Sequence, residues 1–130
     1  MGNSYISKIY NDLSGERYYV DILHSMNSKI PEKSKKILLF EPEDLVLRGI
    51  NNVYKILPYR NIESWNIDTS GNILVLKTNK KELISLKCKN IIDVRKSLYK
   101  HIVNSMINMN YSQDRINEAC KEFNMEEIYL

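Results

Sequence analysis

The chain has 130 residues and a mass of 15.3 kDa, and 43% of its residues are hydrophobic while 27% are charged. This length and composition are typical of one globular domain, and they exclude a disordered or collagen-like chain. The 19 basic and 16 acidic residues give a formal net charge of +3. That excess is too small to predict nucleic-acid binding.

The first 16 residues are predicted to form a separate N-terminal segment. Tyr5, Ile9 and Leu13 recur at intervals of four residues, which favours a brief amphipathic helix. Ser14 and Gly15 follow Leu13 directly, and this pair would end such a helix.

Residues 17–110 are predicted to form the folded body, which begins with a run of short strands. Turn-forming residues such as those at 41–44 and 68–71 separate these strands. We assign Trp65 to the core of this body. Strands at spacings of about eight to twelve residues are typical of an antiparallel sandwich or barrel. The predicted strands are 18–23, 37–40, 45–48, 53–57, 62–67, 73–77 and 84–88.

A long helix is predicted after the strands, capped by Asn90 at its start. Its apolar residues fall on one stripe over about five turns, and this stripe could plug an open corner of the sandwich. The stripe is Ile91, Val94, Leu98, Ile102, Met106 and Met109. Residues 111–130 form a C-terminal tail with a shorter helix at 113–123, capped by Ser112. We expect the apolar end of the tail to fold back on the body, although it could instead bind a partner.

This order of elements resembles the pleckstrin-homology superfold, which phosphotyrosine-binding domains and the third lobe of FERM domains share. The segments that carry the resemblance are 54–62, 71–77 and 83–87, together with the helix at 93–106. It implies a mainly β fold with α: a seven-stranded antiparallel sandwich or barrel, capped by a long C-terminal amphipathic helix. A short extra terminal helix completes the expected fold class.

The start of the chain, Met1-Gly2-Asn3-Ser4, in an Asn- and Lys-rich sequence, is similar to the apicomplexan inner-membrane-complex sub-compartment proteins. That narrower resemblance implies acylation of the N-terminus and a fold that contacts a protein partner. Gly2 is the candidate myristoylation site. Because one myristoyl chain binds a membrane only marginally, Lys8 and other basic residues would have to add electrostatic attraction.

Four lysines between the first two predicted strands form a second candidate site: Lys29, Lys33, Lys35 and Lys36. In the resembled superfold, phosphoinositide-binding members place basic residues in this loop. Each lysine near an anionic surface contributes about 1 kcal/mol, so the loop could bind a phosphoinositide. The alternative is an ordinary solvated loop.

Catalytic residues are not apparent. Cys88 and His101 could be imagined as a nucleophile and its base, but Cys88 alternates with Leu86 and Ile84 and is assigned to the core. Cys88 and Cys120 form no close-spaced pair of the kind that holds a metal ion. No segment has the pattern of a secretory signal or a spanning helix. We therefore expect a cytoplasmic protein with no catalytic activity, metal or cofactor.

The sequence leads to three functional hypotheses. The first is an adaptor on the cytosolic face of a membrane, with the inner membrane complex as one candidate location, anchored through Gly2 and binding a protein partner. The second is a phosphoinositide-binding module that uses the loop from Lys29 to Lys36. The third is a peptide-binding domain of the phosphotyrosine-binding or FERM kind without a membrane role. Its groove would lie between the long helix and the adjacent strand edge.

Overall fold

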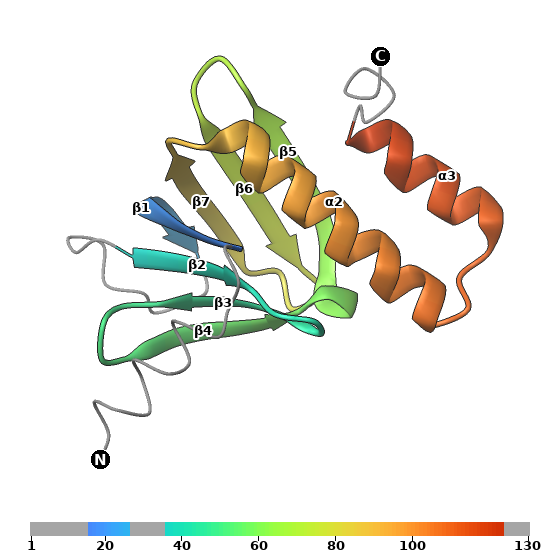
Figure 1. Ribbon diagram of the computed structural model, residues 1–130, viewed down its shortest axis with the longest axis horizontal. Helices are drawn as coiled ribbons and strands as arrows, with labels where there is room; N and C mark the ends of the chain where they lie inside the picture. Colours follow the sequence, from blue (N-terminus) through green and yellow to red (C-terminus); the bar gives the residue numbers. More distant parts are fainter. Residues whose placement is uncertain (1–15, 27–35, 124–130) are drawn as a thin grey trace.

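The computed structural model describes residues 16–26 and 36–123, and its central element is one antiparallel sheet of seven strands. Their order across the sheet is β4-β3-β2-β1-β7-β6-β5, and the sheet curls into a half-barrel (Figure 1). The predicted mainly β fold class with seven strands is confirmed. The strands are β1 (Arg17–Met26), β2 (Lys36–Phe40), β3 (Asp44–Arg48), β4 (Val53–Pro58), β5 (Ile62–Asp68), β6 (Ile73–Thr78) and β7 (Leu83–Cys88).

The turn between β5 and β6 shows how the local sequence ends one strand and starts the next. The Asp68 carboxylate accepts hydrogen bonds from the backbone N–H groups of Ser70 at 3.0 Å and Gly71 at 3.1 Å. Asn72 then adopts a φ of 57°, a left-handed conformation that asparagine tolerates better than most residues. These bonds satisfy the turn backbone and set the register in which Asp68 faces Ile73.

Two helices follow the sheet, α2 (Ile91–Asn108) and α3 (Gln113–Glu122). The apolar stripe of α2 faces the hollow side of the half-barrel, where Val94 and Leu98 are both 0% exposed. Burying each such side chain contributes roughly 1.5–3 kcal/mol. The short 3-10 turn η1 (Tyr59–Asn61) joins β4 to β5 and contacts α2, so the helix closes the seam between the two sheet edges.

The ends of α2 differ from the sequence prediction in two details. Asn90 occupies the N-cap position of α2, as predicted, but its side chain makes no capping hydrogen bond. The helix ends at Asn108, and Met109 is 47% exposed rather than part of the buried stripe. Asn110 has a φ of 58°, and this left-handed residue reverses the chain after the helix.

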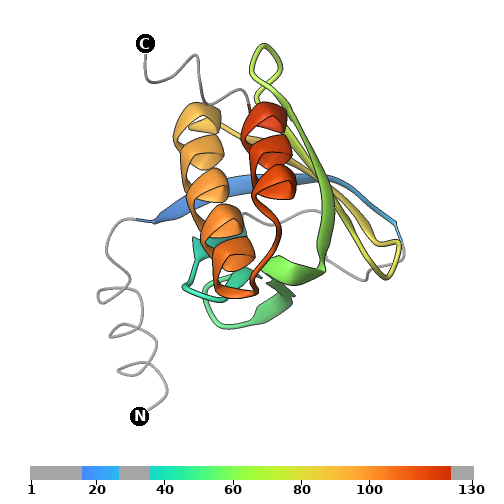
Figure 2. The ribbon, with the colours of Figure 1, turned by 90° about the vertical axis from the view of Figure 1, so that its right-hand side faces the viewer.

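Helix α3 runs back alongside α2 (Figure 2). Its predicted start is confirmed, because the Ser112 hydroxyl accepts a hydrogen bond from the backbone N–H of Arg115 at 3.2 Å. Ile116, Ala119 and Phe123 are buried in the same core as the sheet and α2. The expected folding back of the tail is thus confirmed as far as Phe123, the last described residue.

A second, smaller apolar cluster lies on the outer face of the sheet, the face turned away from α2. Ile37, Leu39 and Val46 form this outer cluster and are 8%, 1% and 5% exposed. Leu39 pairs with Val46 across β2 and β3, whereas the alternate residues Leu38 and Leu47 belong to the main core. Strands β2 and β3 are therefore buried on both faces.

Candidate functional site

Of the residues predicted to bind lipid, only Lys36 lies among the described residues; Gly2, Lys29, Lys33 and Lys35 lie outside them. Lys36 is 0% exposed, and its ammonium lies 5.2 Å from the centre of the Tyr54 ring. It pairs with Val20 on the inward side of the sheet. This placement argues against a headgroup contact by Lys36, because a lipid phosphate cannot reach a buried ammonium.

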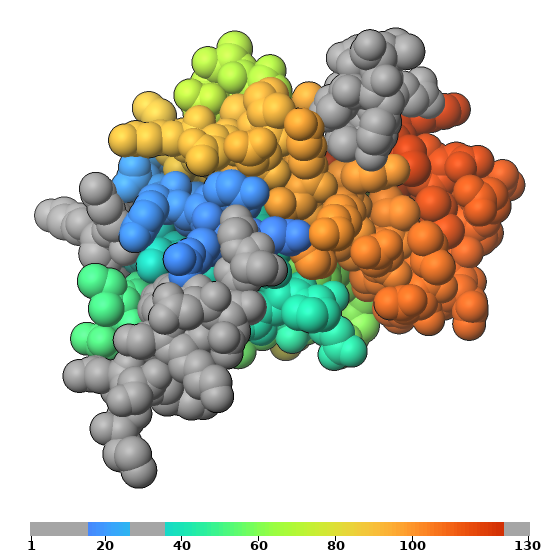
Figure 3. Space-filling view, viewed as in Figure 1, coloured from blue at the N-terminus to red at the C-terminus, as the bar shows by residue number. Residues whose placement is uncertain are grey.

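The groove expected between α2 and the neighbouring strand edge is covered by α3. The rings of Phe123 and Trp65 are stacked with centroids 4.6 Å apart, and Tyr99 of α2 meets Phe123 edge-on at 5.8 Å. In the space-filling view α3 (red) lies directly against α2 (orange; Figure 3). A peptide that added to β5 would have to compete with this packing. Trp65 packs against the main core, and its stacking on Phe123 explains why this aromatic side chain is partly buried.

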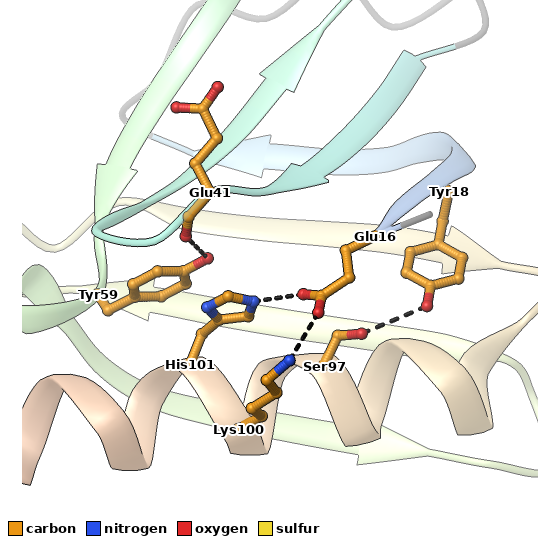
Figure 4. Close-up of polar contacts among 7 residues, drawn as sticks. All are labelled: Glu16, Tyr18, Glu41, Tyr59, Ser97, Lys100 and His101. Carbon is orange, nitrogen blue, oxygen red and sulfur yellow. Dashed lines mark hydrogen bonds and ion pairs between the residues drawn. The ribbon is translucent and has the colours of Figure 1, made fainter. Parts of the chain in front are cut away.

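The point at which the N-terminal segment enters the body is held by a polar cluster (Figure 4). The Glu16 carboxylate contacts the His101 imidazole and accepts a hydrogen bond from the Lys100 ammonium at 3.0 Å. The Glu16 backbone carbonyl accepts a further bond from the N–H of Phe40 at 2.9 Å. Glu16 is therefore joined both to α2 and to β2, and the chain before it leaves the body from a defined place.

Aromatic rings hold His101 in position for this contact. Its imidazole is stacked between Phe40, with centroids 5.7 Å apart, and Tyr59, with centroids 5.2 Å apart. The Tyr59 hydroxyl donates to the Glu41 carbonyl at 2.7 Å. Burial, with nearby carboxylates, raises the pKa of Tyr59 above its ordinary value, so the hydroxyl keeps its proton and remains a donor.

Glu16 should make the stability of the protein depend on pH. Desolvation raises its pKa, but the hydrogen bonds from His101 and Lys100 outweigh that effect and hold the pKa below its ordinary 4.5. The carboxylate therefore stabilises the fold fully above the ordinary pKa, and this contribution disappears as the pH falls through the lowered value. We expect Glu16→Gln to lower the urea midpoint at about pH 7 and to have a smaller effect near about pH 3.

The exposed residue Glu63 provides the control, because it lies 3.8 Å from Lys77 with its side chain 54% exposed. Glu63→Gln should leave the midpoint nearly unchanged at both pH values, since exposed ion pairs contribute little. A loss in Glu16→Gln that stays equal at the two pH values would contradict the assigned role of the carboxylate charge.

Three exposed apolar side chains gather at the β3–β4 hairpin and along the edge strand β4. Ile50, Val53 and Ile56 are 75%, 49% and 55% exposed. In the order of the sheet, β4 has a described neighbour only on its β3 side. A strand edge with exposed apolar residues is a surface to which a protein partner can bind.

Cys88 is buried in the core, as the sequence predicted, and is 0% exposed. Burial raises the pKa of its thiol to about 12, so the thiol keeps its proton at neutral pH and is a poor nucleophile. His101, its imagined base, is bonded to Glu16 instead. Within residues 16–26 and 36–123 no group of three or more His, Cys, Asp or Glu side chains is placed to hold a metal ion.

Sequence reasoning did not find the Glu16 and His101 pair, because the two residues lie 85 positions apart. Glu16 had been assigned to the N-terminal segment, and His101 had been considered only as a base for Cys88. No local pattern relates these residues. The contact depends on the packing of α2 against β2 and η1, which brings His101 to the place where the chain enters β1.

A curled antiparallel sheet of seven strands followed by a C-terminal helix is compatible with a pleckstrin-homology-like fold. No protein-family model matches the chain, and no curated protein is significantly similar to it. Neither of the described helices has the length and apolar character needed to cross a membrane.

Proposed function

We propose that this protein is a non-catalytic adaptor of the pleckstrin-homology type, held at the cytosolic face of a membrane by acylation of Gly2, and that its body binds a protein partner. The observation that carries the proposal is the attachment of Glu16 to both α2 and β2. An acyl group on Gly2 would therefore be joined to the folded body at one defined point, Glu16.

The charge near this point supports a membrane role. Lys96 and Lys100 are exposed and lie one turn apart on α2, and Lys100 contacts Glu16 directly. One acyl chain needs a second attraction to hold a protein at a membrane. The cysteines Cys88 and Cys120 lie in β7 and α3, so the second attraction would come from basic residues rather than from a palmitoyl group beside Gly2.

The partner surface in this proposal is the β3–β4 hairpin with Ile50, Val53 and Ile56. The two alternatives from the sequence receive less support: Lys36 is buried, and α3 covers the place where an added peptide strand would lie. The narrower similarity to inner-membrane-complex sub-compartment proteins is part of the same proposal, because it requires the same acylated Gly2.

Replacing Gly2 with alanine should abolish membrane association, because N-myristoylation requires an N-terminal glycine. The full-length chain and Gly2→Ala would be co-expressed with an N-myristoyltransferase, their intact masses recorded, and their partition onto anionic vesicles measured. We expect the mass of one myristoyl group and pelleting only for the chain with Gly2.

A matched pair of variants separates the alternatives. Reversing the charges of Lys33 and Lys35 should leave pelleting nearly unchanged if the acyl chain dominates, but should abolish it if the loop binds a phosphoinositide. An unmodified chain that stays in solution would refute the anchored adaptor. Pelleting of unmodified Gly2→Ala that is lost on reversing Lys33 and Lys35 would support the phosphoinositide hypothesis.

A further inference from the structure

A cavity of about 210 Å³ lies between η1, the start of β5, the second half of α2 and the first turn of α3. It is at the opposite end of α3 from Phe123, so the stacking of Phe123 on Trp65 does not fill it. A water molecule in the liquid takes up about 30 Å³. The cavity therefore has room for a small molecule or for one amino-acid residue.

The floor of the cavity is apolar. Ile62, Ile102 and Met106 line it, are 7%, 2% and 6% exposed, and belong to the main core. The ring of Tyr59, which is 2% exposed, also lines the cavity. An apolar group that entered the cavity would leave water and pack on these side chains, and this transfer is favourable.

The rim of the cavity carries hydrogen-bond donors that the protein does not use. Arg60, Ser105 and Tyr111 line the cavity, and their side chains make no hydrogen bond or ion pair within residues 16–26 and 36–123. A guanidinium has only donors, and each hydroxyl can donate one hydrogen bond. A ligand that offers acceptor oxygens would therefore satisfy groups that are otherwise left without partners.

Arg115 adds a second guanidinium to the lining. Its Nη1 atom is buried without a hydrogen-bond partner, because the carboxylate oxygens of Glu118 and Glu122 are 3.9 and 3.8 Å away. Glu63 is the single acidic residue of the lining, and it lies 3.8 Å from Lys77. Two arginines against one glutamate give the lining a formal charge of +1, which matches a ligand with one negative charge.

We propose that this cavity binds a small carboxylic acid in its ionised form. The apolar body of the acid packs on Ile102 and Met106, and its carboxylate accepts hydrogen bonds from Arg60 and Arg115 at the rim. The planar fork of a guanidinium matches the two oxygens of a carboxylate. The cavity volume limits the acid to about seven or eight non-hydrogen atoms. This binding goes beyond the proposed function, because it needs neither acylation nor a membrane.

Methyl NMR of the full-length chain tests the proposal, with 4-methylpentanoate as the probe and Ile and Met methyl groups labelled. We expect the signals of Ile102 and Met106 to shift saturably at neutral pH, while Ile84, which is 1% exposed in the main core, stays in place. The matched amide, 4-methylpentanamide, keeps the shape and removes the charge. It should bind about tenfold more weakly, because the charge-assisted hydrogen bonds are lost.

Variants test whether the rim arginines hold the carboxylate. Arg115→Met keeps much of the side-chain volume and should weaken binding of the acid about tenfold, with little effect on the amide. Lys121→Met removes the same charge from the exposed side of the same helix and should leave both affinities unchanged. Arg60→Met is the second test, because Arg60 is exposed in η1 and its replacement does not disturb the packing of α3.

Three outcomes would overturn the proposal: no saturable shift at Ile102 and Met106, equal affinity for the acid and the amide, or unchanged affinity in both arginine variants. The same chemistry occurs at the C-terminal residue of a polypeptide, so acetyl-Gly-Leu with a free carboxylate is titrated in parallel. Tighter binding of this peptide than of 4-methylpentanoate would assign the site to a chain end, and weaker binding would assign it to a free acid. Membrane partition plays no part in this readout, so its failure and that of the anchored adaptor are distinguishable.

Discussion

Replacing Phe123 with alanine should lower the free energy of unfolding by about 3–4 kcal/mol. The Phe123 side chain is 1% exposed and fills the space between the rings of Trp65 and Tyr99. The substitution removes a large buried ring and two aromatic contacts, and paired rings contribute about 1 kcal/mol beyond their buried area. Since Phe123 is the residue that follows α3, we expect the helix to lose most of its attachment to β5.

The fluorescence of Trp65 measures this effect directly, because the sequence contains a single tryptophan. Urea unfolding followed at this residue should show the lower stability, and the emission of the folded variant should move to longer wavelength as Trp65 becomes solvated. Lys121→Ala, on the exposed side of α3, should change stability by less than about 0.5 kcal/mol. Unchanged emission and a loss below about 1 kcal/mol in Phe123→Ala would mean that α3 is not held in this place in solution.

This result also bears on the peptide-binding hypothesis. A tightly held α3 leaves the edge of β5 closed to an added strand, whereas a helix that separates easily would leave that edge open.

Replacing Glu82 with alanine should cost about 2–4 kcal/mol. Glu82, the residue directly before β7, is 6% exposed, and its carboxylate forms an ion pair with Lys55 of β4 and accepts a hydrogen bond from the Thr78 hydroxyl at 3.3 Å. Strands β4 and β7 are separated by three strands in the sheet, so this pair closes the half-barrel across its hollow side. Removing the carboxylate leaves the Lys55 ammonium without its counter-charge in a site that is only 25% exposed.

A double variant distinguishes the loss of the pair from the loss of packing. Lys55→Met/Glu82→Met removes both charges and keeps apolar volume, and we expect it to be more stable than Glu82→Ala, because no charge is left without its partner. Urea unfolding followed by Trp65 fluorescence measures the free energy of unfolding of the unsubstituted protein and of both variants. If Glu82→Ala and the double variant were equally stable, the ion pair would not be what joins β4 to β7.

The sequence predicted most accurately those structural features that depend on residues close together in the chain. Alternation of apolar residues placed Val20 and Ile22 in a strand, Ser112 marked the start of α3 through its bond to Arg115, and Asp68 marked the β5–β6 turn. Each of these features is formed by residues that are close together in the sequence, so the local sequence is enough to predict it. Asn90 was also placed correctly at the start of α2, although its side chain makes no capping hydrogen bond.

The position of Lys36 shows where a usable signal was missed. It alternates with Leu38 and Phe40, and all three lie on the inward side of β2, but the lysine was assigned to the preceding loop because of its charge. The unbroken apolar run from Ile37 to Phe40 was a second signal. Such a run is typical of a strand buried on both faces, and this explains the outer cluster.

The sequence by itself thus determined the seven strands, the two C-terminal helices and the apolar faces, because a periodicity of two or 3.6 residues is a local property of the chain. Only the tertiary structure decided that Glu16 meets His101, that Glu82 meets Lys55, and that α3 covers the edge of β5. Two of these contacts join residues that lie 85 and 27 positions apart in the sequence, and the third joins the end of α3 to β5 through Phe123 and Trp65. The curl of the sheet and the packing of α2 bring the residues of these contacts together. The sequence around either residue of a pair has no pattern that predicts this proximity.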